Sequence, residues 1–500
     1  MTLAQTTNAE ILRTGFLARR QRGNFINGLE QEPHSGKYLA VVDPASELQV
    51  AQAPDSDRHD VNDAVAAARA AFEDSEWSRM RPADRERLLF QLSVLIEKNG
   101  DELSFLETLQ SGKLQGIARA VDVGAGAEFV RYMAGWATKI EGQTLQPSIG
   151  FPPSVQYHTW TRREPVGVVA AIVPWNFPLA IALWKVAPAL ATGCTVVLKP
   201  SPETPLTALR LAELALEAGF PPGVLNVVCG AGETGAALVG HPGINKISFT
   251  GSTPTGQAIG RMAVDNMTRT TLELGGKSPL IVLEDADIQQ AAFGAAMGIF
   301  FNQGQVCTAG SRIYVHRKKF DAVTQEVARI AQSMKIGSGF DPTTQLGPVV
   351  SKRHFERVMG YLETAREEGA TALTGGERSG TAGYFVKPTV LVNASASMRV
   401  VQEEIFGPVV VAMPFDDVEE VIQMANTSPY GLAASIWSNN LSQVHRMVPR
   451  LQAGTVWVNC HNMLDSNLPL GGYKHSGVGK DLGRASIESY TELKSVCMAV

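Results

Sequence analysis

Strand-like apolar runs alternate with helix-like segments between residues 166 and 274, and this alternation constrains the fold most strongly. The runs, rich in β-branched and other apolar residues, lie at 166–173, 195–199, 224–228, 246–250 and 269–274. Between them are helical patterns such as residues 206–219. Strands that are apolar throughout and alternate with helices are typical of βαβ units around a buried parallel sheet. We therefore predict an α/β fold.

A second series of strand-like runs follows in the C-terminal half. Its members lie at 278–283, 312–315, 409–415, 433–437 and 455–459. Gly275 and Gly276 stand between the two series and fit a hinge. The length of 500 residues agrees with about three domains or lobes. We therefore predict two α/β lobes that meet near residue 275.

Three further stretches complete the predicted organisation. Residues 60–140 have helical periodicity, and Asp60 is the expected N-cap of the helix that begins there. Residues 140–162 alternate in polarity and contain prolines, which is typical of a β-hairpin or an extended arm. The pattern beyond Gly477 indicates a helix followed by a terminal strand.

The charge balance and hydropathy exclude several classes of partner. The chain has 44 basic and 49 acidic side chains, for a formal net charge of −5. Without a basic footprint for a polyanion, we expect no nucleic-acid partner. No segment approaches the roughly 18 uninterrupted apolar residues of a membrane span, and the N-terminus lacks an apolar signal core. We expect a soluble, cytoplasmic protein that does not bind membranes.

One of the five cysteines differs from the others in its setting. Their odd number and spacing exclude a disulfide scaffold and a zinc cluster, and we expect no metal site. A cysteine is by default a small buried hydrophobe, reduced inside a cell. Cys307, however, lies in a polar, glycine-containing loop after the helical pattern at 291–301. An accessible loop is the setting that a nucleophilic thiolate needs. The other cysteines are Cys194, Cys229, Cys460 and Cys497.

Glu273 and Asn176 each stand where a predicted strand ends. Glu273 lies between two leucines before a Gly-Gly pair. Partial burial there would raise its pKa toward the range of a general base, although a buried, paired glutamate fits equally well. Asn176 lies between two prolines in IVPWNFPL. Its amide could donate to a developing oxyanion, although the pattern by itself favours an ordinary turn asparagine.

Two glycine-containing loops and a lysine indicate nucleotide binding. Residues 230–235 have the GxGxxG spacing after a predicted strand, but no acidic residue follows at the usual distance of ~20 positions. Residues 249–253 also follow a strand and open a helix, so their backbone N–H groups could bind phosphate. Lys199 ends a third strand. We expect a nucleotide site that departs from the usual fingerprint.

Seven motifs in order resemble the aldehyde dehydrogenase superfamily, and the similarity runs from about residue 25 to 495. The motifs are IVPWNFPL, LKPSPETP, KISFTGST, TLELGGKSP, FFNQGQVCTAGSR, EEIFGPV and LPLGGYKHSGVGKDLG. The resemblance implies two Rossmann-like three-layer lobes and a β-hairpin oligomerisation arm. It places the nucleotide-binding domain at 1–139 and 163–274, the catalytic domain at 275–476, and the arm at 140–162 and 477–500.

The resemblance also assigns catalytic roles. Cys307 would be the nucleophile that forms a thiohemiacetal and then a thioester, and Asn176 with the Cys307 N–H would stabilise the oxyanion. Glu273 would activate the water that releases the acid. Lys185 and Asp481 would relay protons. The family commonly has glutamate at the position of Asp481, so this last role transfers less directly.

NAD is the cofactor that the resemblance implies. Lys199 would hold the adenosine ribose, Ser252 a phosphate and Glu404 the nicotinamide ribose. Further residues expected at the cofactor cleft are Ile172, Trp175, Gly232, Phe249, Gly251 and Phe406. Three residues after the lysine, NAD-preferring members often have a glutamate, whereas this chain has Pro202 followed by Glu203. The repulsion against a 2′-phosphate is therefore smaller, and use of NADP stays open.

The positions that match the family's substrate tunnel are apolar and partly aromatic. They are Phe177, Ile181, Trp184, Phe301, Val306, Thr308, His461, Leu464, Leu468 and Leu470. No lysine or arginine is among them to bind a carboxylate, and no acid to attract a cation, although Asp465 is nearby. Several stretches, such as VRYMAGWATKIEGQTLQ, look especially like bacterial phenylacetaldehyde dehydrogenases. We predict oxidation of an arylacetaldehyde, with phenylacetaldehyde first; another apolar aldehyde is the alternative, and without the resemblance core packing would explain these residues.

The presence of Glu273 bears on how the acyl group is released. Members that pass the acyl group to coenzyme A commonly lack the general-base glutamate, so Glu273 favours hydrolysis. A non-catalytic relative would have little need for Cys307, Glu273 and Asn176 together. The arm and terminal strand imply a homotetramer, with a dimer as the alternative.

Overall fold

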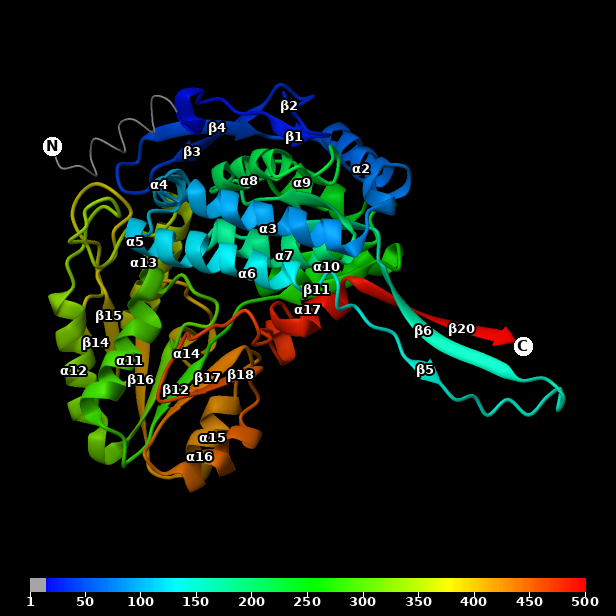
Figure 1. Cartoon of the computed structure of the whole chain (residues 1–500). Helices are drawn as coiled ribbons and strands as arrows, with labels where there is room; N and C mark the ends of the chain where they lie inside the picture. Colours follow the sequence, from blue (N-terminus) through cyan, green and yellow to red (C-terminus); the bar gives the residue numbers. More distant parts are fainter. Residues whose placement is uncertain (1–14) are drawn as a thin grey trace.

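The computed structural model describes residues 15–500 and contains two α/β lobes and a projecting arm (Figure 1). The first lobe is built on an eight-stranded sheet in the order β19-β11-β10-β7-β8-β9-β1-β2. Its five central strands are parallel, and the strands at its edges are antiparallel. The strands are β1 (Asn24–Ile26), β2 (Leu29–Gln31), β7 (Val168–Ile172), β8 (Thr195–Lys199), β9 (Leu225–Val227), β10 (Lys246–Thr250), β11 (Arg269–Glu273) and β19 (Gly477–Val478).

The second lobe contains a seven-stranded sheet in the order β14-β15-β16-β13-β12-β17-β18. All of its pairs are parallel except β14 with β15. The strands are β12 (Pro279–Val282), β13 (Arg312–His316), β14 (Thr371–Thr374), β15 (Thr389–Val392), β16 (Val409–Phe415), β17 (Ala433–Trp437) and β18 (Thr455–Val458). Both predicted series of strands are therefore present, and the predicted α/β class is confirmed.

Both faces of the central strands are buried, which explains why these strands are apolar throughout. In β7, Val169 and Ala171 belong to one core cluster, whereas Val168, Ala170 and Ile172 belong to another on the opposite face. Helices α7 and α8 cover one face of the first sheet and α2, α9 and α10 the other. Each lobe thus has three layers.

The helices fill the outer layers. They are α2 (Arg58–Glu73), α3 (Pro82–Lys98), α4 (Gly100–Ser111), α5 (Gln115–Ile117), the π-helix η3 (Ala118–Ala125), α6 (Gly126–Ala134), α7 (Pro178–Thr192), α8 (Leu206–Glu217), α9 (Gly232–Val239), α10 (Thr253–Asp265), α11 (Ile288–Phe300), α12 (Phe320–Ser333), α13 (Lys352–Glu367), α14 (Arg399–Gln402), α15 (Val418–Asn426), α16 (Leu441–Met447) and α17 (Gly483–Ser489). Among residues 15–500, no helix is long and apolar enough to cross a membrane.

The arm is a three-stranded sheet that extends away from both lobes (Figure 1). Strand β20 (Thr491–Ala499) pairs antiparallel with β6 (Tyr157–Pro165), and β5 (Thr144–Leu145) pairs with the other edge of β6. Residues 477–478 lie outside the arm, because they form β19 and pair with β11. The resemblance had assigned these two residues to the arm, and a two-residue edge strand has no periodicity that would mark it in the sequence.

The structure corrects one predicted helix boundary. Helix α2 is capped by Asp57 and not by Asp60. The Asp57 carboxylate accepts from the helix N-terminus, and the Asp60 carboxylate reaches back to the Asp57 backbone N–H, which forms a capping box. Both residue types suit an N-cap, and only the backbone geometry distinguishes cap from third position. The hairpin of β3 (Tyr38–Val42) and β4 (Gln49–Pro54) was not predicted.

Candidate active site

Four parallel strands of the first lobe end side by side and present predicted site residues at one edge of the sheet. Ile172 pairs with Lys199 on one side and with Phe249 on the other. Thr250 pairs with Glu273. Ligands of open α/β sheets bind at the carboxyl ends of the strands, where the strand order reverses. Here the reversal lies at β7, the first strand of this parallel set.

A cavity of about 1000 Å³ opens at this edge and extends to residues of the second lobe. All nine residues predicted to bind the cofactor lie in its wall: Ile172, Trp175, Lys199, Gly232, Phe249, Gly251, Ser252, Glu404 and Phe406. Asn176 and Cys307 also border it. A second hollow of about 1060 Å³ lies beside α11 and α12 and contains none of the predicted residues. The first cavity is therefore the candidate active site.

The groups in the cavity wall fit a dinucleotide. The N-terminus of α10, where Ser252 is the cap residue, provides unpaired backbone N–H groups for phosphate. Gly251 packs so closely on the Phe249 ring that a Cβ atom there would lie 2.5 Å from it. Lys199 donates to the Pro200 carbonyl at 2.9 Å, and burial lowers its pKa to about 8. Diphosphate and ribose hydroxyls need such donors.

Glu404 supplies an acceptor at the other end of the cavity. One of its carboxylate oxygens accepts from the Gly276 backbone N–H at 2.9 Å. Burial raises the pKa of Glu404 to about 7, against the influence of that N–H and of Lys277. Phe406 has a left-handed backbone (φ 64°), which is uncommon for a bulky residue. Its ring meets Trp175 edge to face at 5.3 Å, so the two aromatic side chains form one apolar wall.

The turn before Cys307 is held in an uncommon conformation by Asn302 and Gln303. Both residues have positive φ angles, 46° and 58°. The Asn302 side chain donates to the Asn176 carbonyl at 3.1 Å and to the Gln305 carbonyl at 3.3 Å. The Asn176 side chain donates to the same Gln305 carbonyl at 3.0 Å. This network connects the predicted oxyanion donor to the loop that carries the predicted nucleophile.

The Cys307 thiol is half-buried and protonated at neutral pH. Burial raises its pKa to about 12, and the carboxyls of Glu404 and Glu273 raise it further toward that value. The backbone N–H groups of Thr308 and of Cys307 itself act in the opposite direction. A reaction at Cys307 therefore needs a group that takes the thiol proton.

Glu273 is buried at the end of β11, and its Oε1 atom has no hydrogen-bond partner. Burial, and then the charge of Asp481, raises its pKa well above that of an ordinary glutamate, whereas Lys185 and Lys480 lower it. A buried carboxyl with a raised pKa and a free oxygen can accept a proton from water or from a thiol.

Lys185 and Asp481 form a buried ion pair next to this glutamate. The Lys185 Nζ atom lies 2.9 Å from Asp481 Oδ2, and neither side chain is more than 2% exposed. The second Asp481 oxygen, Oδ1, has no partner. Aspartate is shorter than the glutamate that is common in the family at this position, but Asp481 still reaches Lys185. Lys185, Asp481 and Glu273 do not border the large cavity.

The ten residues predicted for the substrate pocket also lie outside the wall of the large cavity. The rings of Phe177 and Phe301 stack at 6.3 Å. His461 uses both ring nitrogens within the protein, toward Ser435 Oγ and the Thr308 carbonyl, and burial lowers its pKa to about 4. Seven of the ten are buried or half-buried: Phe177, Ile181, Trp184, Phe301, Val306, Thr308 and His461. An eighth, Leu470, is also buried, and its backbone pairs with that of Asp481. The remaining two are exposed on a loop: Leu464 and Leu468.

The sequence patterns missed several residues in the cavity wall. Ser201, Glu203, Arg353, His354 and Arg357 border the cavity. Arg353 pairs with Glu203 at 3.1 Å, so two distant segments meet at the end of the cavity that holds Lys199. Arg353, His354 and Arg357 all lie in α13, and no sequence motif marks them. Only the packing of the second lobe brings them here.

The comparison with protein families decides the family. The family described as "Aldehyde dehydrogenase family" matches residues 31–496, which is most of the chain. The chain belongs to the aldehyde dehydrogenase family. This confirms the similarity that the seven motifs indicated.

Individual aldehyde dehydrogenases are similar over almost the whole chain. A phenylacetaldehyde dehydrogenase of Pseudomonas fluorescens is 53% identical over 477 residues, which cover 95% of each chain. The solved NAD+ complex of an aldehyde dehydrogenase from Bacillus cereus has a TM-score of 0.94 at 48% identity and covers 96% of this chain and 97% of that one.

A betaine aldehyde dehydrogenase of Staphylococcus aureus, solved with NAD+, has a TM-score of 0.95 at 38% identity and covers 99% of this chain and 98% of that one. The fold is thus shared with solved aldehyde dehydrogenases, one of which is named for betaine aldehyde. The predicted fold is confirmed, whereas the roles of single residues and the domain boundaries stay predictions.

Proposed function

We propose that this protein oxidises an arylacetaldehyde, with phenylacetaldehyde as the preferred substrate, to the carboxylic acid with NAD+. The observation that carries the proposal is the placement of Cys307 and Asn176 in the wall of the same cavity as all nine predicted cofactor residues. A nucleophile must border the hydride acceptor for this chemistry, because the carbon attached to sulfur gives up the hydride.

In the first step the sulfur of Cys307 adds to the aldehyde carbon, and the thiol proton ends on the aldehyde oxygen, which becomes the hydroxyl group. The Asn176 side chain and the Cys307 backbone N–H donate to the oxygen that becomes negative. Asn176 is pre-oriented for this role, because its side chain is buried and tied to the Gln305 carbonyl. The product of this step is a thiohemiacetal.

When bound, the oxidised nicotinamide accepts the hydride. Loss of the hydride and of the hydroxyl proton leaves a thioester on Cys307. Glu273 then takes a proton from water, the hydroxide attacks the thioester, and the carboxylic acid leaves as the thiolate re-forms. The buried pair of Lys185 and Asp481 lies next to Glu273 and provides a route for its proton.

The apolar character of the substrate rests on the ten tunnel positions. None carries a charge, because His461 is neutral at physiological pH. One lysine, Lys113, approaches Phe177, but its ammonium is neutralised by Asp122 at 2.6 Å. A carboxylate or a quaternary ammonium on the substrate would find no counter-charge. The Pseudomonas relative at 53% identity, which is named for phenylacetaldehyde, supports the same choice.

We also propose a cytoplasmic homotetramer that is assembled through the arm. The arm carries exposed apolar side chains on β5, on β20 and in the loop before β6, including Leu145, Leu493 and Phe151. Such side chains are costly in water unless another subunit covers them. A reducing compartment agrees with the need of Cys307 for a free thiol.

A substrate panel tests the proposal. We expect kcat/KM to be highest for phenylacetaldehyde among phenylacetaldehyde, benzaldehyde, hexanal, betaine aldehyde and succinic semialdehyde, with NAD+ preferred to NADP+. A preference for hexanal would replace the arylacetaldehyde by an aliphatic one. A preference for betaine aldehyde or succinic semialdehyde would contradict the apolar pocket, and a strong NADP+ preference would contradict the cofactor.

A further inference from the structure

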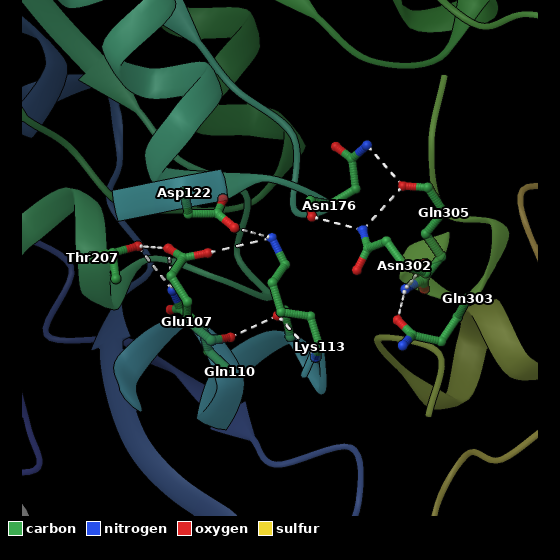
Figure 2. A network of polar contacts seen from close by, with 10 residues as sticks. Glu107, Gln110, Lys113, Asp122, Asn176, Thr207, Asn302, Gln303 and Gln305 are labelled. Carbon is green, nitrogen blue, oxygen red and sulfur yellow. Dashed lines mark hydrogen bonds and ion pairs between the residues drawn. The ribbon is translucent and has the colours of Figure 1, made fainter. Parts of the chain in front are cut away.

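Three ionisable side chains that the proposed reaction does not use form a cluster in the interior of the first lobe. Glu107 lies in α4, Asp122 lies in the π-helix η3, and Lys113 lies between the two. None is more than 1% exposed. The Lys113 Nζ atom is 2.6 Å from Asp122 Oδ2 and 3.8 Å from Glu107 Oε2 (Figure 2). Buried ion pairs contribute little net stability, so the cluster calls for another explanation.

Burial changes the acidity of both carboxyls in the cluster. Burial, and then the charge of Asp122, raises the pKa of Glu107 to about 8, so Glu107 holds a proton. Burial raises the pKa of Asp122 as well, against the influence of Lys113, to which Asp122 is the nearer carboxyl. Lys113 thus lies between two buried carboxyls whose pKa values are both raised, and Thr207 donates to Glu107.

Lys113 also contacts the predicted substrate pocket. Its Nζ atom lies 4.2 Å from the centroid of the Phe177 ring, which is a cation–π contact. Phe177 directly follows Asn176 and is the residue before α7. The backbone N–H groups of Leu179 and Ala180, in the first turn of α7, lower the pKa of Glu107 and Asp122, respectively, so they lie close to these carboxyls. The cluster therefore binds both the ring of Phe177 and the backbone that follows it.

The same segment packs against the loop of Cys307. A Cβ atom at Gly347 would lie 2.4 Å from the Gly112 carbonyl and 2.9 Å from the Gln303 side chain, so this junction has no spare room. Figure 2 shows the cluster beside the network of Asn176, Asn302 and Gln305. The chain around Lys113 is thus fixed between the two elements that carry the predicted oxyanion donor and nucleophile.

We propose that Lys113, neutralised by Asp122, is a positioning residue for the aldehyde. Its ammonium fixes the Phe177 ring and with it the pocket wall next to Asn176, so that removing the charge changes which aldehydes fit. The inference rests on the proposed function, because Phe177 and Asn176 have their roles only there. Lys113 itself touches neither the substrate nor the reacting atoms.

The test replaces Lys113 by methionine, K113M, which keeps the length of the side chain and removes its charge. We expect kcat/KM for the best aldehyde to fall about 10- to 100-fold, mainly through KM, with a smaller preference for phenylacetaldehyde over hexanal. The NAD+ dissociation constant and the rate of Cys307 alkylation by iodoacetamide should stay within about twofold. K98M, at the exposed end of α3, is the matched control.

The outcomes separate positioning from a purely structural role. A structural role would reduce kcat for all aldehydes alike and leave KM unchanged, and that result would overturn the proposal. So would unchanged kinetics. If K113M does not fold, D122N supplies the test: it keeps the cation and removes its partner, and we expect the same aldehyde-specific rise in KM. Unaltered aldehyde kinetics in a folded D122N would overturn the proposal.

A double-mutant cycle with F177L tests the contact directly. If Lys113 acts through the Phe177 ring, K113M should change kcat/KM by less than about twofold further in the F177L background. Fully additive effects would contradict the proposal. The cycle uses whichever panel aldehyde the wild type oxidises best. A wild type that prefers hexanal therefore refutes the proposed substrate while the cycle still tests the role of Lys113.

Discussion

Cys307 differs from the other four cysteines in its surroundings. Cys194 and Cys229 are buried in the first lobe, and burial raises both pKa values. Cys497 is exposed on the arm. Cys307 alone borders the cavity that holds the predicted cofactor residues. Cys307 is therefore distinguished from the other cysteines by its place in the cavity wall and not by the exposure of its thiol.

We expect C307A to lose aldehyde oxidation by about 10³-fold or more, because no other group can hold the acyl intermediate. NAD+ affinity, measured by fluorescence titration, should stay within about twofold. C497A is the matched control and should oxidise aldehyde at the wild-type rate. Residual oxidation by C307A near the wild-type rate would show that the nucleophile lies elsewhere.

We expect E273Q to slow release of the acid about 10²- to 10⁴-fold, so that a product burst precedes a slow steady state. The pKa of Glu273 is raised, chiefly by burial. Its basic form therefore increases as pH rises through that raised pKa, and the wild-type rate should rise with it. Rapid-quench assays across pH should find no such rise in E273Q. A missing burst with unchanged turnover would exclude the role.

Gly304 allows the turn that carries Cys307 to pack against a neighbouring segment. It lies in the turn between α11 and Cys307, with a φ of 70°. A Cβ atom there would lie 2.0 Å from the Gly407 carbonyl, in the chain just after Glu404 and Phe406. The turn that carries Cys307 and the segment that carries Glu404 thus touch at a point where only glycine fits.

We expect G304A to be destabilised by about 1–3 kcal/mol and to lose at least about tenfold in kcat, because the turn or its partner must move. Thermal unfolding and steady-state kinetics measure the two effects. G380A is the control: its φ of 74° imposes similar backbone strain, but its nearest contact is at 4.0 Å. If the two variants behaved alike, strain alone would explain the result and the close approach would be unimportant.

The arm is the part of the molecule that is best suited to contact another subunit. Strands β6 and β20 pair along nine residue pairs and project beyond the lobes (Figure 1). Leu493 on β20 is 57% exposed, and Phe151 in the loop before β6 is 81% exposed. An isolated three-stranded sheet has little core of its own. Contact with another subunit would give the arm the apolar burial that a single chain does not.

We expect L493K to reduce the assembly from a tetramer to smaller species at micromolar concentration, because a buried lysine at an apolar interface is costly. Light scattering after size exclusion gives the mass. L441K is the matched control, since Leu441 is 68% exposed on α16, away from the arm (Figure 1). An unchanged mass for L493K would place the interface elsewhere.

The sequence by itself determined the α/β class, both strand series and the order of the elements, because buried parallel strands must be apolar throughout. It also offered Cys307, Glu273 and Asn176 as candidates, because loops and strand ends can be recognised from short stretches of sequence. The family resemblance then assigned their roles. It did not separate Asp57 from Asp60 as the cap of α2, because both types suit that position.

Which distant segments share one site becomes apparent only in the tertiary structure. Arg353 meets Glu203, and Lys113 meets Phe177, across long separations in sequence. The buried contacts of Lys113 with Glu107 and Asp122 likewise depend on helix packing. Local sequence patterns report what each segment must bury or expose, whereas contacts between segments arise from the packing of whole layers, which no single stretch encodes.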